Sequence, residues 1–401
     1  MKMDYGLSGE SIICFAGEDW WYHHPHSKNH ILKRLAQQNK VLFVNSITMG
    51  LPPMSNPDFF LKIRRKLKSY VKWLRKAPEG LWVMTPINLP FYGTKTARKL
   101  SSLMLIIQLR LAMLMIGIRT PVLWVAIPPA ADLVGHLGER VLLYQVSDKY
   151  DANEDSALSA EVIRSFDRRL KRSADIVMFS GRKLFEESQE ANRYYLEQAV
   201  DFDHFATEAR DMSPDIADIP RPILGYFGAM DYVMDTDLMA EVSRLRPDWH
   251  WVMLGLKSNS VQVSASNIHF LGPKPYSDLP KFVKCFDVCV LPWRQTNAFT
   301  SYGSAIKVRE YLATGKPVVI SPLYEYLNTP GVGIYRSTEE FISHVEDALR
   351  TDTPAARAVR QSVVRDCTWD VRTRQVGTLI DSLIKGEKYL YKAPLATVSP
   401  A

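Results

Sequence analysis

Ser304-Ala-Ile-Lys307-Val-Arg-Glu310-Tyr-Leu-Ala-Thr-Gly315-Lys-Pro-Val-Val-Ile320 is the stretch that decides the fold. It follows a run typical of a buried strand, and its own pattern predicts a helix that starts at Ser304, ends at Gly315 and leads into another apolar strand. Ser304, Lys307 and Glu310 are three residues apart, so they share one helix face near the end where unbonded N–H groups attract anions. The pattern favours a nucleotide-diphosphate site, with Lys307 on the phosphates and Glu310 on the ribose hydroxyls. A solvated helix face tolerates the same residues.

Outward from this stretch, short apolar runs alternate with helical patterns along the whole chain. Unbroken apolar strands joined by helices indicate parallel sheets covered on both faces. Two series of such runs predict an α/β protein with two doubly wound domains. The expected strands are 11–16, 40–45, 81–84, 122–126, 141–146 and 175–180, then 223–227, 250–254, 267–271, 287–291 and 317–320.

The domain boundary is expected where turn and linker residues gather, in 206–221. We therefore predict an N-terminal domain at 1–205 and a C-terminal domain at 222–385. A tail follows at 386–401, frayed from Tyr389 onward, and the C-terminal helix is expected to pack back on the first domain.

Composition and charge narrow the class of protein. The 401 residues are 46% hydrophobic and 23% charged, as in soluble globular proteins, and the net charge of +7 is concentrated in residues 1–200. No nucleic-acid reading motif accompanies the basic residues, so we expect no nucleic acid as partner. The four cysteines have no metal-ligand spacing and the N-terminus has no apolar signal core, which favours a cytoplasmic protein with buried free thiols.

Two segments suggest contact with a membrane surface. Residues 61–76 hold eight cations and no acid, with apolar residues spaced as one helix stripe, which is typical of a helix that meets anionic lipid. A solvated helix packed on its own domain explains the pattern equally. Residues 101–118 are the most apolar, but Gln108 and Arg110 in their middle favour a buried or membrane-leaning helix over a span.

Several segments together resemble the bacterial glycosyltransferases of the GT-B fold, in the group 1, family-4-like set that builds cell-surface polysaccharides. The resemblance covers roughly residues 10–385 and implies two Rossmann-like domains facing a central cleft. It is carried by 29–36, 41–44, 144–150, 173–180 and 200–205 in the first half, and by 222–230, 246–255, 267–276 and 304–320 in the second.

The resemblance implies a donor sugar nucleotide on the C-terminal domain. Glu310 would hold the ribose, Lys307 and the helix start at Ser304 the diphosphate, and the loop with Lys274 and Tyr276 would flank the base. Gly228 would leave room for the phosphates after the first strand of that domain, although a simple turn explains this glycine equally. Tyr302 stands where many relatives carry a glutamate that touches the donor sugar, and 227–232 lack the family's usual cation.

For the chemistry, Asp148 is the candidate general base. It follows the strand 141–146, at the edge where catalytic groups of such sheets gather, and its segment is similar to that of the xanthan-type glucuronosyltransferase. The alternative is an N-cap of the next helix. The acidic, aromatic and histidine-rich loop after the first strand suits sugar recognition, so Glu18, Asp19, His26 and His30 are the expected acceptor-binding residues. No metal site is expected there.

We therefore expect a metal-independent glycosyltransferase that needs no cofactor. Its donor would be a UDP- or GDP-linked sugar, UDP being favoured, and its acceptor a glycan or a polyprenyl-diphosphate-linked oligosaccharide at the inner face of the cell membrane. Two other classes share the architecture: a sugar-nucleotide 2-epimerase, and a non-catalytic sugar-binding protein.

Overall fold

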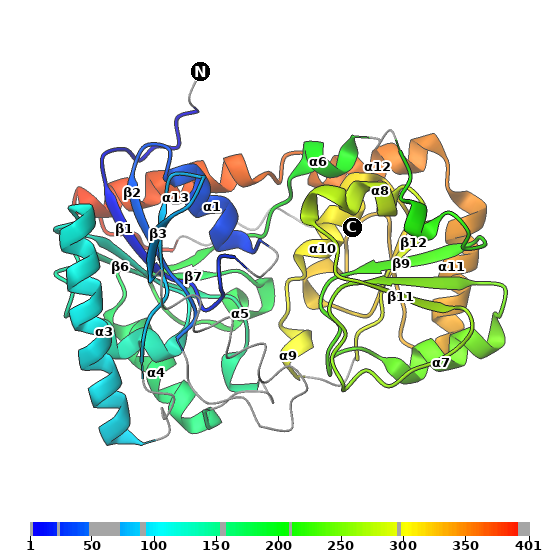
Figure 1. The fold of residues 1–401 in the computed structure, drawn as a ribbon. Coiled ribbons are helices and arrows are strands. Elements are labelled where there is room, and N and C mark those ends of the chain that lie inside the picture. Colours follow the sequence, from blue (N-terminus) through cyan, green and yellow to red (C-terminus); the bar gives the residue numbers. More distant parts are fainter. Residues whose placement is uncertain are drawn as a thin grey trace. The chain divides into compact units, whose positions relative to one another are not determined.

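The computed structural model describes residues 3–21, 25–47, 73–88, 94–152, 158–207, 211–294 and 298–391. The chain divides into two compact units (Figure 1). Unit 1 comprises Met1–Glu197 and Arg372–Ala401, and unit 2 comprises Gln198–Val371. The division at Glu197 lies before the linker predicted at 206–221.

Unit 1 is built on a sheet of eight strands within its described residues, in the order β3-β4-β2-β1-β5-β6-β7-β8. All neighbours are parallel except β3 and β4. The central strands are buried on both faces, which explains their unbroken apolar runs. The strands are β1 (Ser11–Phe15), β2 (Lys40–Val44), β3 (Leu74–Lys76), β4 (Trp82–Met84), β5 (Val122–Val125), β6 (Val141–Val146), β7 (Ile176–Phe179) and β8 (Arg193–Tyr195).

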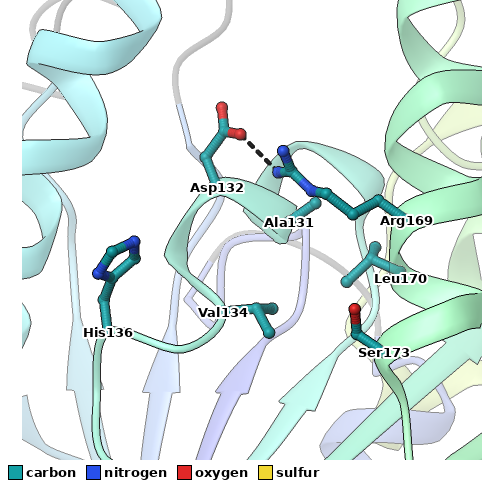
Figure 2. A pocket seen from close by; sticks show the side chains of 7 residues that line it. All are labelled: Ala131, Asp132, Val134, His136, Arg169, Leu170 and Ser173. Carbon is teal, nitrogen blue, oxygen red and sulfur yellow. Dashed lines mark hydrogen bonds and ion pairs between the residues drawn. The ribbon is translucent and has the colours of Figure 1, made fainter.

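The helices of unit 1 cover this sheet. They are α1 (Ser27–Leu35), α3 (Lys95–Ile116), α4 (Ala160–Ser173), α5 (Arg182–Glu187) and α13 (Trp369–Ile384), with short 3₁₀ turns η1 (Pro128–Leu133) and η2 (Tyr150–Ala152). α3 is the long cyan helix in Figure 1. A hollow of about 300 Å³ lies between η1 and α4 (Figure 2).

Unit 2 has a six-stranded, wholly parallel sheet in the order β11-β10-β9-β12-β13-β14 within its described residues. The order reverses between β9 and β12, and such a switch point is where open α/β sheets bind ligands. The strands are β9 (Ile223–Phe227), β10 (His250–Leu254), β11 (Ile268–Gly272), β12 (Val288–Leu291), β13 (Val318–Ile320) and β14 (Val332–Ile334).

The helices of unit 2 include α10, the element predicted from the opening stretch. They are α6 (Phe202–Ala206), α7 (Thr236–Leu245), α8 (Leu279–Val283), α9 (Ala298–Ser301), α10 (Ile306–Thr314), α11 (Thr338–Thr351) and α12 (Pro354–Val364), with η3 (Pro214–Ile216), η4 (Tyr276–Asp278) and η5 (Tyr324–Tyr326). One core of buried apolar side chains joins the sheet to α7, α8, α10 and α11.

All eleven predicted strands are present, and the two doubly wound sheets confirm the predicted fold class. The basic helix predicted at 61–76 is wrong at its end, because Leu74–Lys76 forms β3 and pairs with β4; its residues 61–72 lie outside the described part of the chain. The fraying predicted from Tyr389 is also wrong as far as Tyr391. The Tyr391 N–H donates to Ala191 O at 2.9 Å, and its ring lies 5.0 Å from that of Phe185.

Candidate functional site

The start of α10 differs from the prediction by two residues. The helix begins at Ile306 with Ala305 as its N-cap residue, so Ser304 lies before the helix and not in its first turn. Ala305 has extended backbone dihedrals, which set the helix start beyond Ser304. The Ser304 hydroxyl is buried and has no hydrogen-bond partner among the described residues. Lys307 and Glu310 share a helix face as predicted.

The Lys307 side chain points toward the switch point of the sheet. Its ammonium donates to the Tyr226 hydroxyl at 3.0 Å and lies 4.7 Å from the Tyr226 ring centroid and 5.0 Å from that of Trp293. Tyr226 belongs to β9, and Trp293 follows β12, the two strands that flank the reversal. Two aromatic faces hold the cation without neutralising it, so its charge is available to an anion.

Gly228 follows β9 directly beside this ammonium. Its φ of 137° is a conformation that residues with a side chain rarely adopt, and a Cβ here would lie 2.4 Å from Lys307 Nζ. The Gly228 N–H donates to Leu254 O at 2.9 Å. The position therefore requires glycine, and the backbone leaves the lysine accessible at this edge.

Glu310 lies one turn further along α10 and is 7% exposed. Its Oε1 accepts from the Tyr276 hydroxyl at 3.1 Å, and the Tyr276 ring stacks on His204 with centroids 4.8 Å apart. Burial raises the pKa of the Glu310 carboxyl from 4.5 to about 7, against the opposing effects of the Tyr276 hydrogen bond and the Lys307 charge. A carboxyl in this state changes charge near neutral pH.

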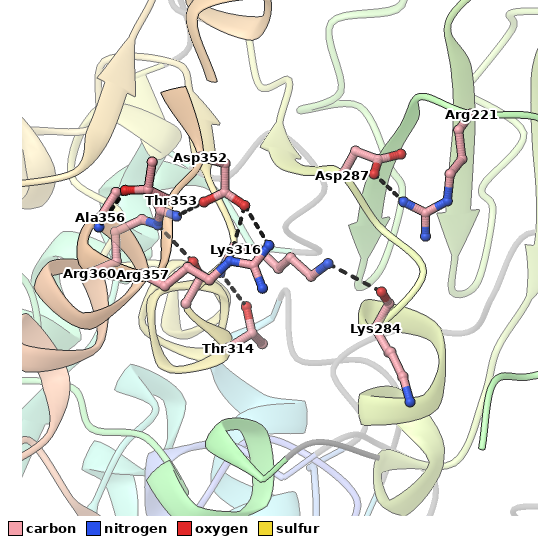
Figure 3. Close-up of polar contacts among 11 residues, drawn as sticks. Arg221, Lys284, Asp287, Thr314, Lys316, Asp352, Thr353, Ala356, Arg357 and Arg360 are labelled. Atoms are coloured by element: carbon pink, nitrogen blue, oxygen red, sulfur yellow. Dashed lines mark hydrogen bonds and ion pairs between the residues drawn. The ribbon is translucent and has the colours of Figure 1, made fainter. Parts of the chain in front are cut away.

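Both ends of α10 are held by other parts of unit 2. At its start, the Tyr326 hydroxyl donates to Ala305 O at 2.8 Å, and Arg309 forms a buried ion pair with Glu325 at 3.1 Å. At its end, Arg360 Nε donates to Gly315 O at 2.8 Å while the same guanidinium pairs with Asp352 (Figure 3). These contacts fix the position of the Lys307–Glu310 face.

The two remaining donor-site candidates, Lys274 and Tyr302, lie in other surroundings than Lys307 and Glu310. Lys274 forms an ion pair with Asp215 of η3, and its ammonium lies 5.3 Å from the Phe282 ring centroid. Tyr302 directly follows the short helix α9 and is half-buried. Of the other candidates, Gly228 lies beside the Lys307 ammonium and Tyr276 hydrogen-bonds Glu310.

In unit 1, charged side chains gather where β1 and β6 end. Glu18 follows β1, and its carboxylate pairs with the Lys28 ammonium of α1 at 3.3 Å, both side chains being largely buried. Asp148 follows β6 and is half-buried. Burial raises the pKa of the Asp148 carboxyl, the Lys28 charge opposes this and the Glu18 charge adds to it, so the three groups form one electrostatic cluster.

The N-cap alternative for Asp148 is wrong. Among the described residues, the 3₁₀ turn η2 follows Asp148 closely, and the next α-helix, α4, is capped by the Ser159 hydroxyl. The backbone oxygen of Asp148 accepts from the Tyr150 N–H at 3.0 Å in a local turn.

The acceptor-site candidates divide between a loop and a helix. Asp19 Oδ2 accepts from the Asn45 side chain at 3.2 Å, which ties the loop after β1 to the end of β2. His26 is the N-cap residue of α1, where its N–H donates to Asn29 Oδ1 at 2.9 Å. His30 is buried within α1. No group of three or more His, Cys, Asp or Glu suited to a metal ion occurs among the described residues.

Three residues of these clusters were not predicted from the sequence as site residues: Lys28, Tyr226 and Trp293. Lys28 is 5% exposed, but a lysine between His26 and His30 gives no sign of burial before the helix is placed. Tyr226 lies in one predicted strand and Trp293 follows another. These two strands flank the strand-order reversal, and that position could have marked both residues as site candidates.

Comparison with known proteins gives consistent results. Residues 221–351 match the family of glycosyl transferases group 1. The putative teichuronic acid biosynthesis glycosyltransferase TuaH of Bacillus subtilis is 24% identical over 284 residues, which are 63% of this chain and 70% of that protein. Sucrose-phosphate synthase from Thermosynechococcus elongatus matches with a TM-score of 0.68 at 12% identity, over 94% of this chain and 100% of that chain. Anabaena HepE in complex with UDP-glucose matches with a TM-score of 0.62 at 11% identity, over 93% and 99%.

The two parallel-sheet units and their structural neighbours define the fold, which is the GT-B fold. Within this fold, residues 221–351 form a domain that matches the family of glycosyl transferases group 1. This confirms the resemblance and the transferase class predicted from the sequence.

Proposed function

We propose that this glycosyltransferase moves a sugar from a nucleotide-diphosphate sugar, UDP-linked rather than GDP-linked, to a glycan or polyprenyl-diphosphate-linked acceptor in cell-surface polysaccharide biosynthesis. The observation that carries the proposal is the Lys307 ammonium, held 3.0 Å from the Tyr226 hydroxyl beside Gly228 at the switch point of unit 2. The similarity to a putative teichuronic acid biosynthesis glycosyltransferase supports the pathway class, and the similarity to HepE, whose structure is a complex with UDP-glucose, supports the base.

In the proposed donor site, the Lys307 charge and the N–H groups at the start of α10 offset the charge of the leaving diphosphate. Ionised Glu310 accepts the two ribose hydroxyls, and Gly228 leaves space for the phosphates. Tyr276 orients Glu310 through their hydrogen bond. Ser304 contributes its buried hydroxyl, while Lys274 and Tyr302 line the more distant base and sugar. The site works without a metal because the lysine and the helix supply the positive field.

In the proposed chemical step, Asp148 takes the proton of the acceptor hydroxyl as the acceptor oxygen bonds to the anomeric carbon. The bond from that carbon to the phosphate oxygen breaks, and the nucleoside diphosphate leaves with the electron pair. Burial and the Glu18 charge raise the pKa of Asp148, which strengthens it as a base. Glu18, Asp19, His26 and His30 bind the acceptor glycan.

We place the enzyme in the cytoplasm, peripheral on the inner face of the cell membrane, because a polyprenyl-diphosphate acceptor is anchored in that leaflet. The excess of cations in residues 1–200 supports attraction to anionic lipid.

The test is calorimetric titration of the full chain with UDP and with GDP. Binding of UDP that Lys307→Ala or Glu310→Ala weakens by about 2 kcal/mol, the range for a lost charged hydrogen bond, would support the donor site. Lys281→Ala and Glu346→Ala, exposed residues of the same unit, are the matched controls. Equal binding by all four variants would overturn the assignment.

A further inference from the structure

The outward face of α3 is apolar and exposed to solvent. Six large side chains on one side of this helix are 49–79% exposed: Leu100, Leu103, Ile107, Leu111, Leu114 and Met115. The spacings of three and four residues place them in one stripe. Leu105, Leu109 and Ala112 are fully buried on the opposite side. The stripe is therefore not the core-facing side of an amphipathic helix but a second apolar face.

Among the described helices, α3 alone is long and apolar enough to cross a bilayer. Its packing argues against a span. Gln108 hydrogen-bonds both the N–H and the carbonyl of Ile87, and Arg110 in mid-helix donates to His136 O at 2.9 Å. A helix tied to its own domain along one side has only the other side for lipid, so the stripe suits a helix lying along a membrane surface.

A row of arginines lies in the same helical layer. α3 leads from β4 to β5 and α4 from β6 to β7, both in the same direction across the sheet, so right-handed connections place both helices on one face. Arg98 of α3 lies 5.4 Å from the Phe166 ring of α4. Arg164, Arg168 and Arg172 are four residues apart and exposed on the side of α4 away from the buried Phe166. The apolar stripe and the arginine row are therefore on the outer sides of two helices that cover the same face of the sheet.

Two adjoining hollows lie along α4. One of about 300 Å³ is bordered by His136, Arg169 and Ser173 (Figure 2). A second of about 490 Å³ is lined by Ser165, Arg168, Arg169, Arg172 and Ser173. Arg169 pairs with Asp132, whereas Arg168 and Arg172 have no ion-pair partner among the described residues. Unpaired guanidinium groups beside serine hydroxyls suit the phosphate of a lipid headgroup.

We propose that α3 and α4 form the membrane-docking surface of unit 1, with the α3 stripe in the acyl–headgroup boundary and the α4 arginines on anionic headgroups. The two helices together carry nine cations and two acids, so a second copy of the chain on this face would bring like charges together. An anionic bilayer satisfies the apolar and the charged parts at once. The inference rests on the proposed membrane-anchored acceptor and names the surface that reaches it.

The test is co-sedimentation of the full chain with phosphatidylcholine vesicles, with and without phosphatidylglycerol at about a third of the lipid. Leu103→Gln/Ile107→Gln/Leu114→Gln removes the stripe, and Arg168→Glu/Arg172→Glu reverses the row. The matched controls are Leu256→Gln, 66% exposed, and Arg244→Glu, both on the surface of unit 2. Circular dichroism verifies the folding of each variant.

Binding to the anionic vesicles that each docking variant weakens at least about tenfold, with the controls unchanged, would support the proposal. Salt is expected to weaken binding of the stripe variant more than that of the arginine variant, because only the former keeps the arginine contacts. No binding by the wild type, or equal binding by all variants, would overturn it. So would a dimer, seen by light scattering, that the stripe variant dissociates. UDP titration of the same samples separates the two proposals, since loss of docking leaves the donor site in unit 2 intact.

Discussion

Glu310→Gln is expected to weaken nucleotide binding and, at the same time, to stabilise the protein above neutral pH. The carboxyl is 7% exposed, and burial raises its pKa from 4.5 to about 7. In the unfolded chain this group ionises near pH 4.5, but in the folded protein only near pH 7. Between these values the unfolded state binds fewer protons, so the contribution of Glu310 to stability falls as pH rises.

The magnitude follows from the two pKa values. A carboxyl pKa moved from 4.5 to about 7 corresponds to roughly 3 kcal/mol of lost stability at pH 8, and to almost none at pH 4.5. Glutamine is nearly isosteric, cannot ionise and keeps an oxygen that accepts from the Tyr276 hydroxyl. The substitution should therefore recover most of that free energy at pH 8 and little at pH 5.

The assay is urea unfolding of wild type and Glu310→Gln at pH 5 and pH 8, followed by tryptophan fluorescence, since Trp251 and Trp293 report on unit 2. Uridine titration at both pH values measures binding without the titrating phosphates of UDP. We expect the variant to gain about 3 kcal/mol at pH 8 and to bind uridine weakly at either pH. A variant less stable than wild type at pH 8 would refute the argument from burial. A wild type whose uridine affinity does not rise from pH 5 to pH 8 would refute the role of the ionised carboxylate.

Three further predictions concern the neighbouring residues. Gly228→Ala should cost about 1–3 kcal/mol of stability and weaken UDP binding, because an alanine is strained at a φ of 137° and its Cβ would displace Lys307; urea unfolding and calorimetry measure the two effects. Asp148→Asn should lower the transfer rate about 10²–10⁴-fold while UDP affinity stays constant, and a matching loss of UDP affinity would contradict a role as base. Arg309→Met should cost about 3–5 kcal/mol because it leaves Glu325 buried without its partner, and Arg309→Met/Glu325→Leu should restore much of it; equal unfolding of both variants would count against the pair.

The sequence predicted the strands that are buried on both faces and the five-residue edge strand β11, and it missed the three short edge strands β3, β8 and β14. β3, β8 and β14 end their sheets, have three residues each and are largely half-buried. Edge strands need no long apolar run, and cations on β3 protect an exposed edge, so Leu74–Lys76 lacks the pattern of a strand. The spacing of Leu67, Tyr70 and Leu74 suggested a helix instead.

For the candidate sites, spacing on one element was predictable and contact between elements was not. Lys307 and Glu310 are three residues apart in one helix, and local geometry alone puts them on one face. The aromatic faces around Lys307 come from two other segments that meet at the strand-order reversal. Lys28 joins Glu18 and Asp148 only because α1 lies at the end of the sheet, and no local pattern records that burial.

The anchoring of α10 at both ends has a thermodynamic consequence. Its first turn is held by Tyr326 and Glu325, and the carbonyl that follows it is held by Arg360. Lys307 is further confined between two rings. A ligand arriving at this helix meets groups that have already lost their conformational freedom during folding. The conformational entropy of these side chains is therefore lost on folding and not on binding. The heat of UDP binding should contain little contribution from rearrangement of unit 2.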